Sequence, residues 1–532
     1  MPLSPPVRST GALPHAALSD APWVALAAIM LLAPAVLWGR PFVFGDTPYY
    51  WGWGGDILDA LHRPWPRPGQ PWIPGRSMHG WGGDLGGVTL ADLRFNLTWL
   101  GARSAFYAAP FRLLTDLGGL WLVAGLQALI SAWVVKVAVR AVAPASSILI
   151  YIGVIAALTA ASSLGFEAAY AMPDVFGGLA VLASVVLAVH PDRIGRVERI
   201  GLVGLMAYAV LAHAENSLNL AAAIVIGALV YRCDGLSWRA AAGRAAPTAI
   251  ALAVGLALAT LGGLVLGAAF GRPVQMAPFA AGRVLADGSA QAYLRQSCPR
   301  VRLATCDLAD QPPSEIEYYL WIYPLEGPPP ARVADPIRYR LAQFDRLQAR
   351  HVTEAQADQR ERFLAEQPRL VAGALETDAL TQARASLVNA VAALINVGVG
   401  RDFDTVQFLM REGHSRLRER IAALLPGGIE CVGPGGAYCG RFDLGWVAPP
   451  QGAVIVASFA FLLARLLHRR AAPRDGLVNF LVLILGLVLA NACLCGAISG
   501  PYARYQTRVE WLVPLGALLL VAQWAQSRPA RT

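Results

Sequence analysis

Long apolar runs constrain this chain more than any other feature of its sequence. A helix needs about 20 predominantly apolar residues to cross a bilayer, with some variation for tilt. The sequence offers ten such runs, at about 22–39, 117–138, 147–163, 173–190, 200–213, 218–231, 246–269, 452–468, 477–498 and 509–526. Only 15% of the residues are charged, whereas a soluble protein has about a quarter. The sequence therefore predicts an all-α polytopic membrane protein of about ten transmembrane helices.

The loop arginines predict the orientation of these helices, because cytoplasmic loops of membrane proteins carry an excess of Lys and Arg. If the N-terminus is cytoplasmic, each cytoplasmic segment carries arginine, while the short outer turns near 164–171 and 214–217 carry no Lys or Arg. Only "PYARYQTR" (501–508) breaks the pattern, with Arg504 and Arg508. The distribution predicts a multi-pass protein of the bacterial inner membrane with both termini in the cytoplasm.

This topology divides the chain into three parts. An N-terminal transmembrane module (1–269) holds about seven spans and a long outer loop at 39–116. A C-terminal module (451–532) holds about three more. The segment 270–450 between them is large enough for a mainly helical extracytoplasmic domain. Within it, the apolar but short run at 385–400 predicts an interfacial or buried helix.

Two close cysteine pairs lie in this predicted outer domain. Cys298 and Cys306 bracket "CPRVRLATC", and Cys431 and Cys439 bracket "CVGPGGAYC". In an oxidising compartment such pairs predict local disulfide bonds. A zinc site is the alternative, but the C-x7-C spacing is not that of a usual zinc motif, and neither loop contains His.

The topology also sends several ionisable side chains to the outer ends of the spans. Such residues are costly near lipid and often mark function. They are Asp46, Glu167, Asp174, His213, Glu215, Arg504 and Arg508. Each has a structural explanation taken alone: Asp46 can cap a helix, Asp174 can complement a helix dipole, and Tyr49 can belong to an interfacial aromatic belt.

Taken together, these residues suggest chemistry at the outer face. A carboxylate near the lipid boundary can act as a general base toward an acceptor hydroxyl. Arginines at the same level can bind a phosphate and stabilise the charge that develops as it leaves. A substrate with a phosphate at headgroup level and a long apolar tail would suit both groups, and polyprenyl-phosphate sugars have that form.

Several stretches resemble the GT-C class of integral-membrane glycosyltransferases, which includes protein mannosyltransferases and the aminoarabinose transferase of lipid A. The stretches are "FGDTPYYWGWGGDILDAL", "GARSAFYAAPFRLL", "AMPDVFGGLAVLASVVLA", "LMAYAVLAHAENSLNL" and "YARYQTRVEWLVP". The resemblance covers about 1–270 and 450–532. It implies that Asp46 lies at the catalytic centre and that the chain transfers a sugar from a polyprenyl-phosphate carrier. Some members of the class require a divalent metal and others do not, and no ligand cluster in this sequence decides between them.

The resulting hypothesis is a lipid-phosphate-sugar-dependent glycosyltransferase. Asp46 would be the base or would orient the acceptor, and the substrate would contact Tyr49, Glu167, Asp174, His213, Glu215, Arg504 and Arg508. Its partners would be membrane lipid, the lipid-linked donor and a glycan, lipid or protein acceptor. No dense basic run indicates a nucleic-acid partner. The alternatives are a transporter or flippase, a non-catalytic component of envelope polysaccharide assembly, and an outer-facing acyltransferase. Transporters often contain inverted repeats, and this sequence has no clear internal repeat.

Overall fold

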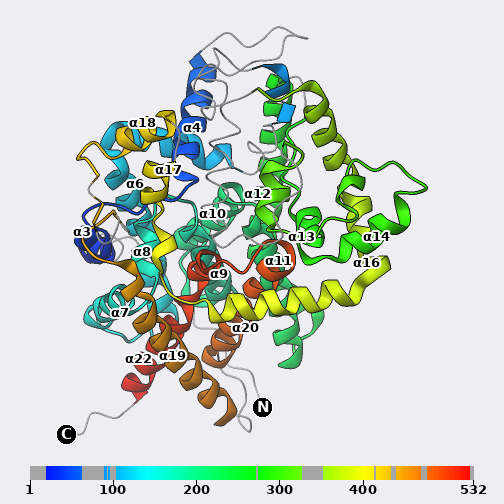
Figure 1. The fold of residues 1–532 in the computed structure, drawn as a ribbon. Helices are drawn as coiled ribbons and strands as arrows, with labels where there is room; N and C mark the ends of the chain where they lie inside the picture. Colours follow the sequence, from blue (N-terminus) through cyan, green and yellow to red (C-terminus); the bar gives the residue numbers. More distant parts are fainter. Residues whose placement is uncertain are drawn as a thin grey trace, which may run out of the picture.

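The computed structural model describes residues 20–62, 89–92, 94–95, 103–270, 273–325, 351–412, 415–429, 431–432, 436, 439–468 and 476–527. These residues fold into helices joined by turns and loops (Figure 1), with an isolated bridge between Phe42 and Tyr170 and no strand among them. The all-helical part of the prediction is therefore confirmed.

Seven helical segments in the described chain are long and apolar enough to cross a membrane. They are α2–α3 (Ala21–Leu31 and Ala33–Trp38), α6 (Ala105–Val142), α11 (Glu215–Cys233), α12 (Trp238–Phe270), α19 (Ala448–His468), α20 (Gly476–Ile498) and α21–α22 (Ala503–Glu510 and Leu512–Ser527). Each matches one predicted span, as expected for a multi-pass membrane protein. The other three predicted runs coincide with the shorter helices α7 (Ile148–Ala161), α9 (Val175–Val189) and α10 (Arg196–Ala212). The count of ten spans stays a prediction.

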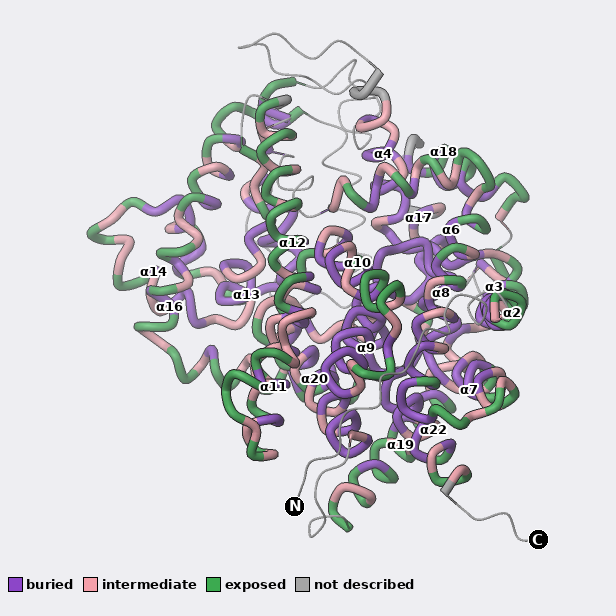
Figure 2. Tube along the Cα trace, turned by 180° about the vertical axis from the view of Figure 1, so that it is seen from behind, coloured by how far each residue is buried: buried purple, intermediate pink, exposed green. Residues whose placement is uncertain are grey.

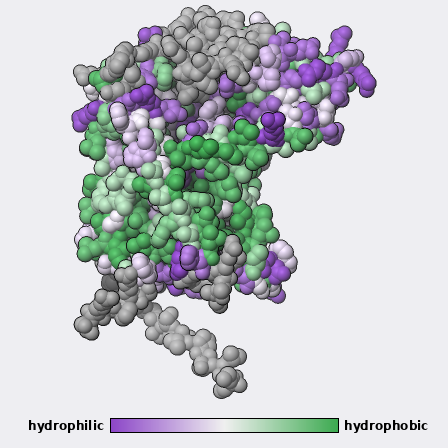
Figure 3. Space-filling model, turned by 60° about the horizontal axis from the view of Figure 1, so that its bottom comes forward, coloured by the Kyte–Doolittle hydropathy of each residue, from purple (hydrophilic) through white to green (hydrophobic). Residues whose placement is uncertain are grey.

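The arginine-bearing helix ends meet at one end of this bundle. Contacts join Lys136 to Asp20, Arg140 to Glu198, Arg193 to the carbonyl of Ala141, and Arg244 to the carbonyl of Ala188. Between this end and the other, a broad band of hydrophobic side chains crosses the face of the molecule that Figure 3 shows. Large indoles are exposed near helix ends, at Trp238, Trp446 and Trp524, where membrane proteins often carry an aromatic belt.

At the centre of the bundle lies α9, all of whose residues are buried (Figure 2). Several helices surround it, and the turn that leads into it, residues 169–174, is also enclosed. The short helix α8 (Leu164–Ala168), which precedes α9 in the chain, is likewise fully buried. This packing places the Glu167–Asp174 turn inside the protein rather than at its surface.

The segment 270–450 divides between two hydrophobic cores. Its first part, with α13 (Phe279–Asp287), α14 (Ser289–Ser297), a π-turn (Tyr318–Ile322) and the first half of α16 (Glu354–Ile395), forms a separate core. Phe95 from the first long loop joins that core. By contrast, the apolar side chains of α17 (Val406–Glu412) and α18 (Ser415–Leu424) pack into the core of the bundle beside α4 (Thr47–His62). Spacing along the chain does not reveal this division, because it depends on which apolar faces meet.

Both predicted disulfide bonds are present. Cys298 bonds to Cys306 within the separate core. Cys431 bonds to Cys439, whose carbonyl accepts a hydrogen bond from Arg40 at 2.6 Å, just beyond the end of α3. The second disulfide therefore lies beside the start of the segment that carries Asp46.

Candidate functional site

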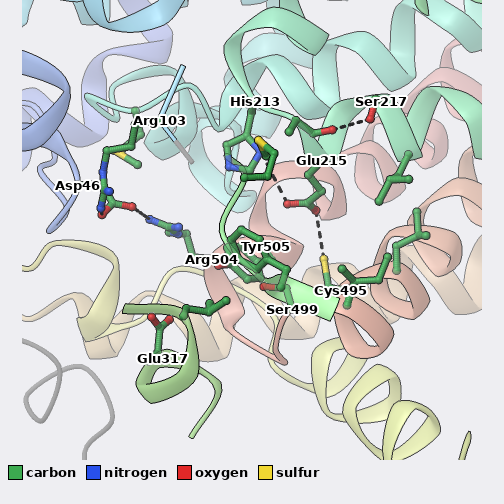
Figure 4. Close-up of a pocket in the computed structure, with 18 of the residues that line it drawn as sticks. Asp46, Arg103, His213, Glu215, Ser217, Glu317, Cys495, Ser499, Arg504 and Tyr505 are labelled. Atoms are coloured by element: carbon green, nitrogen blue, oxygen red, sulfur yellow. Dashed lines mark hydrogen bonds and ion pairs between the residues drawn. The ribbon is translucent and has the colours of Figure 1, made fainter. Parts of the chain in front are cut away.

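A cavity of about 310 Å³ lies at the end of the bundle opposite the arginine-bearing loops. Its polar lining comes from the ends of several helices, namely Asp46, Tyr50, Arg103, His213, Glu215, Ser217, Ser499, Arg504 and Tyr505 (Figure 4). The separate core contributes Phe279, Glu317 and Trp321 to the same cavity. The site is thus shared between the membrane helices and the second core.

Asp46 lies between two arginines. It immediately precedes α4, where its carbonyl accepts hydrogen bonds from the amides of Tyr49 and Tyr50. Its carboxylate accepts a hydrogen bond from Nη2 of Arg103 at 2.5 Å, and its other oxygen lies 4.0 Å from Nη1 of Arg504. Figure 4 shows the three side chains pointing toward one another. Two guanidinium groups at one carboxylate create a setting that suits an additional anion.

A second group of charges lies directly behind the cavity wall. Arg508 follows Arg504 by one helical turn; its Nε donates to Asp174 at 2.8 Å, and its Nη1 donates to Glu215. Nε of Arg504 is 3.8 Å from the same oxygen of Asp174. Since Arg508 and Asp174 are each only 2% exposed, their pairing offsets a large desolvation penalty.

Asp174 and His213, which lie just beyond the ends of the helices α9 and α10, have shifted pKa values. Burial alone would raise the pKa of Asp174, but Arg508 and Arg504 overcome that effect and lower it. Burial, together with the charge of Arg508, lowers the pKa of His213 to about 4. At neutral pH, His213 is therefore an uncharged imidazole on the cavity wall, and Asp174 is a carboxylate beneath it.

Glu167 does not reach the cavity. It is fully buried, and its Oε1 accepts a hydrogen bond from Oγ1 of Thr507 at 2.6 Å. Burial raises the pKa of Glu167 to about 8, with a further contribution from the nearby Asp174 carboxylate. Its position indicates that it supports the helix α21, which carries the two arginines, rather than contacting substrate.

We expect Glu167 to make the protein less stable as the pH rises from about 4.5 to 8. The unfolded chain loses this proton near 4.5, whereas the folded protein keeps it until about 8. The unfolded state is therefore favoured progressively across that interval. The Glu167→Gln variant should lose this part of the pH dependence and melt higher than wild type at pH 8. Thermal unfolding in detergent at pH 5 and pH 8 measures the effect; equal shifts at both values would contradict it.

The predicted site residues separate into two groups. Asp46, His213, Glu215 and Arg504 line the cavity, whereas Glu167, Asp174 and Arg508 lie behind its wall. Tyr49 does not line it either: its ring lies under the guanidinium of Arg103, with 5.0 Å from Cζ to the ring centroid. The next residue, Tyr50, is the one that lines the cavity.

Arg103 is the main residue that sequence reasoning missed. It is one of seven arginines in the outer loop predicted at 39–116, so its residue type alone did not single it out. The stretch "GARSAFYAAPFRLL", which contains it, was noted only as part of the family resemblance. Glu317 and Trp321 carried no comparable signal, because only the folding of the second core brings them to the cavity.

The residues around Asp46 do not fit a divalent metal. Its carboxylate lies beside two guanidinium groups. Their positive charge would repel a metal cation bound at the same carboxylate. Within the described ranges, no group of three or more His, Cys, Asp or Glu is arranged to hold a metal ion.

Comparisons of the chain with known protein families, with curated proteins and with solved structures give no match.

Proposed function

We propose that this chain is a glycosyltransferase of the GT-C type, located in the bacterial inner membrane. It would move a sugar from a polyprenyl-phosphate carrier to a glycan, lipid or protein acceptor on the extracytoplasmic face. The observation that carries the proposal is the Asp46 carboxylate between Arg103 and Arg504 in a cavity at the helix ends. With both termini cytoplasmic, that cavity faces outward.

An apolar groove beside the cavity supports a lipid-linked donor. The groove has a volume of about 840 Å³ and is lined by the start of α6, the end of α10 and the small residues of α12. It shares Arg103, His213, Ala214 and Met276 with the polar cavity. A polar cavity that adjoins an apolar groove suits a substrate with a charged head and a long hydrocarbon tail.

In the proposed reaction, Asp46 accepts the proton of the acceptor hydroxyl as that oxygen forms a bond to the anomeric carbon. The bond between this carbon and the phosphate oxygen breaks, and the phosphate leaves with the electron pair. Arg103 and Arg504 stabilise the departing charge. Nη1 of Arg504 has no hydrogen-bond partner in the described part of the protein, so it can donate to a phosphate oxygen. A phosphate that shares these arginines also draws them away from Asp46, which frees the carboxylate to accept a proton.

The second core is the proposed cover of the cavity. Nε1 of Trp321 donates to Glu317 at 2.6 Å, and the guanidinium of Arg103 lies 5.6 Å from the centroid of the same indole. Arg360, fully buried, donates to the carbonyls of Tyr319 and Tyr323 and so holds this turn in place. Groups from this core at the cavity are well situated to discriminate among acceptors.

The direct test uses purified protein in nanodiscs with a panel of decaprenyl-phosphate-linked sugars. We expect at least one member to be consumed, with release of decaprenyl phosphate that increases when an envelope glycan or lipid A fraction is added. Chromatography of the extracted lipid measures the release. If no member is consumed and decaprenyl phosphate does not bind, the proposal fails.

The groove offers a more specific prediction through Gly263. A Cβ at this position meets no heavy atom within 4 Å, so Gly263→Trp should fold and fill part of the groove. We expect KM for a decaprenyl-linked donor to rise about tenfold or more, equivalent to about 1.4 kcal/mol of lost binding, with kcat little changed. A donor with a ten-carbon tail should be affected much less.

Gly125→Trp is the matched control for this variant. Gly125 also lies on an apolar span and does not line the groove, and a Cβ added there would likewise meet no heavy atom within 4 Å. The control should leave KM unchanged for both donors. Equal effects of the two substitutions, or equal effects on long and short donors, would show that the groove does not hold the tail.

A further inference from the structure

The second half of α16 exposes an apolar face that is interrupted by one charged side chain, the exposed Arg384. The helix departs from helical geometry at Asp378, and six large apolar side chains beyond that point are exposed. They are Leu380, Leu387, Val388, Val391, Leu394 and Ile395, with exposed fractions of 81%, 65%, 59%, 46%, 36% and 71%. Their spacing places them within one side of the helix. We call these six residues the α16 apolar face.

The opposite side of α16 packs on the protein. Ala390 and Ala393 are buried there, and Asn389 donates to the carbonyl of Gly496 at 3.3 Å. A Cβ added to Gly496 would lie 2.5 Å from the backbone nitrogen of Ala390, so the two backbones are in close contact. The helix is therefore fixed in rotation, and the α16 apolar face points away from the protein.

These contacts also fix the level at which α16 crosses the bundle. Gly496 lies two residues before the end of α20, which is long and apolar enough to be a span. Asn396, just beyond α16, donates to the carbonyl of Pro501 at 3.1 Å, in the turn that follows α20. The second half of α16 thus lies at the end of a span, and Figure 1 shows it running across α20 rather than along it.

We propose that the second half of α16 lies in the plane of the membrane, with the α16 apolar face in contact with the acyl chains of the adjacent leaflet. An amphipathic helix at the water boundary buries such a face about 5–10 Å into the headgroup and acyl region. Lipid is the occupant because this face begins where a membrane-spanning helix ends and therefore continues the lipid-facing surface. A second copy or another protein would instead need a matching surface at that same level.

This anchoring would connect the bilayer to two parts of the cavity lining, namely the segments that carry Asp46 and Arg504 and the turn that carries Trp321. The chain after α16 donates from Gly398 to Glu510 at 3.0 Å and from Thr405 to the carbonyl of Val43 at 2.9 Å, close to Asp46. The first half of α16 carries Arg360, which holds the turn that contains Trp321. An in-plane α16 therefore sets the height of the cavity cover relative to the membrane.

Nitroxide labelling in liposomes tests the proposal without requiring turnover. Cysteines replace Leu387, Val391 and Ile395 one at a time in a Cys233→Ser/Cys493→Ser background, where the remaining free thiol, Cys495, is buried. Collision rates with oxygen and with a water-soluble nickel chelate are then measured. We expect all three labels to favour oxygen, as lipid-exposed sites do, and to resemble a label at Leu489, an exposed site on α20. A label at the exposed Ala365, on the first half of α16, should favour nickel.

Two outcomes overturn the proposal. Labels at 387, 391 and 395 that collide freely with nickel would place this face in water. Labels protected from both reagents would indicate a protein partner or a second copy, and crosslinking between the same cysteines would distinguish the two. Detergent-purified protein with an unchanged elution volume shows that each variant is folded.

Discussion

Replacing Asp46 by Asn is expected to reduce sugar transfer by about 10²–10⁴-fold, the usual contribution of a general base. The amide keeps the shape of the side chain and can still accept a hydrogen bond from Arg103, but it cannot take the acceptor proton. The variant also leaves the guanidinium groups of Arg103 and Arg504 without the charge that lies 2.5 and 4.0 Å away from them. Binding of decaprenyl phosphate should therefore be retained or become tighter while turnover is lost.

This opposite effect on binding and turnover distinguishes a base from a structural carboxylate. Turnover is measured as release of decaprenyl phosphate, and binding as the shift in melting temperature with added decaprenyl phosphate. Asp116→Asn is the control, since Asp116 is a partly exposed partner of Arg112 on α6, outside the cavity. A loss of binding together with turnover would mean that Asp46 only maintains the shape of the site. Full activity of the variant would remove Asp46 from the chemistry.

The approximate position of the site could be predicted from the sequence. Which residues line the cavity and which lie buried behind its wall could not. Sequence periodicity and loop arginines sent Asp46 and Arg504 to the same end of the bundle, and the structure brings these side chains to 4.0 Å. Arg504 and Arg508 are four residues apart and share a helix face. Which of them lines the cavity depends on how α21 packs against α9, and that packing buries Arg508.

Helix packing also explains why Tyr50 lines the cavity in place of the predicted Tyr49. Neighbouring residues on a helix point about 100° apart, so only one of them can face the cavity. The choice is made by the packing of α4 against α6, where Tyr50 and Tyr107 meet edge to face with ring centroids 5.1 Å apart. Sequence patterns predict that an aromatic group lies near the boundary, but they do not predict this rotation.

Replacing Arg508 by Met should destabilise the protein by about 3–5 kcal/mol, the cost of removing one partner from a buried ion pair. The substitution leaves Asp174, which is 2% exposed, without its closest cation and removes the donor that holds Glu215. Met fills much of the same volume, so the loss reports charge rather than a cavity. Reversible unfolding by denaturant in mixed detergent micelles measures the change in the free energy of unfolding.

Two further variants separate charge from packing in this result. Arg401→Met removes the partner of Asp443 from a pair whose arginine side chain is 67% exposed, and it should cost less than about 1 kcal/mol. Adding Glu215→Gln to Arg508→Met removes one of the two carboxylates that lost its partner, so the double variant should recover part of the stability. If Arg508→Met costs no more than Arg401→Met, or if Glu215→Gln worsens it, the buried charges do not stabilise each other. In that case the wall behind Asp46 and Arg504 would be held by packing alone, and the position of Arg504 would not depend on its charged neighbours.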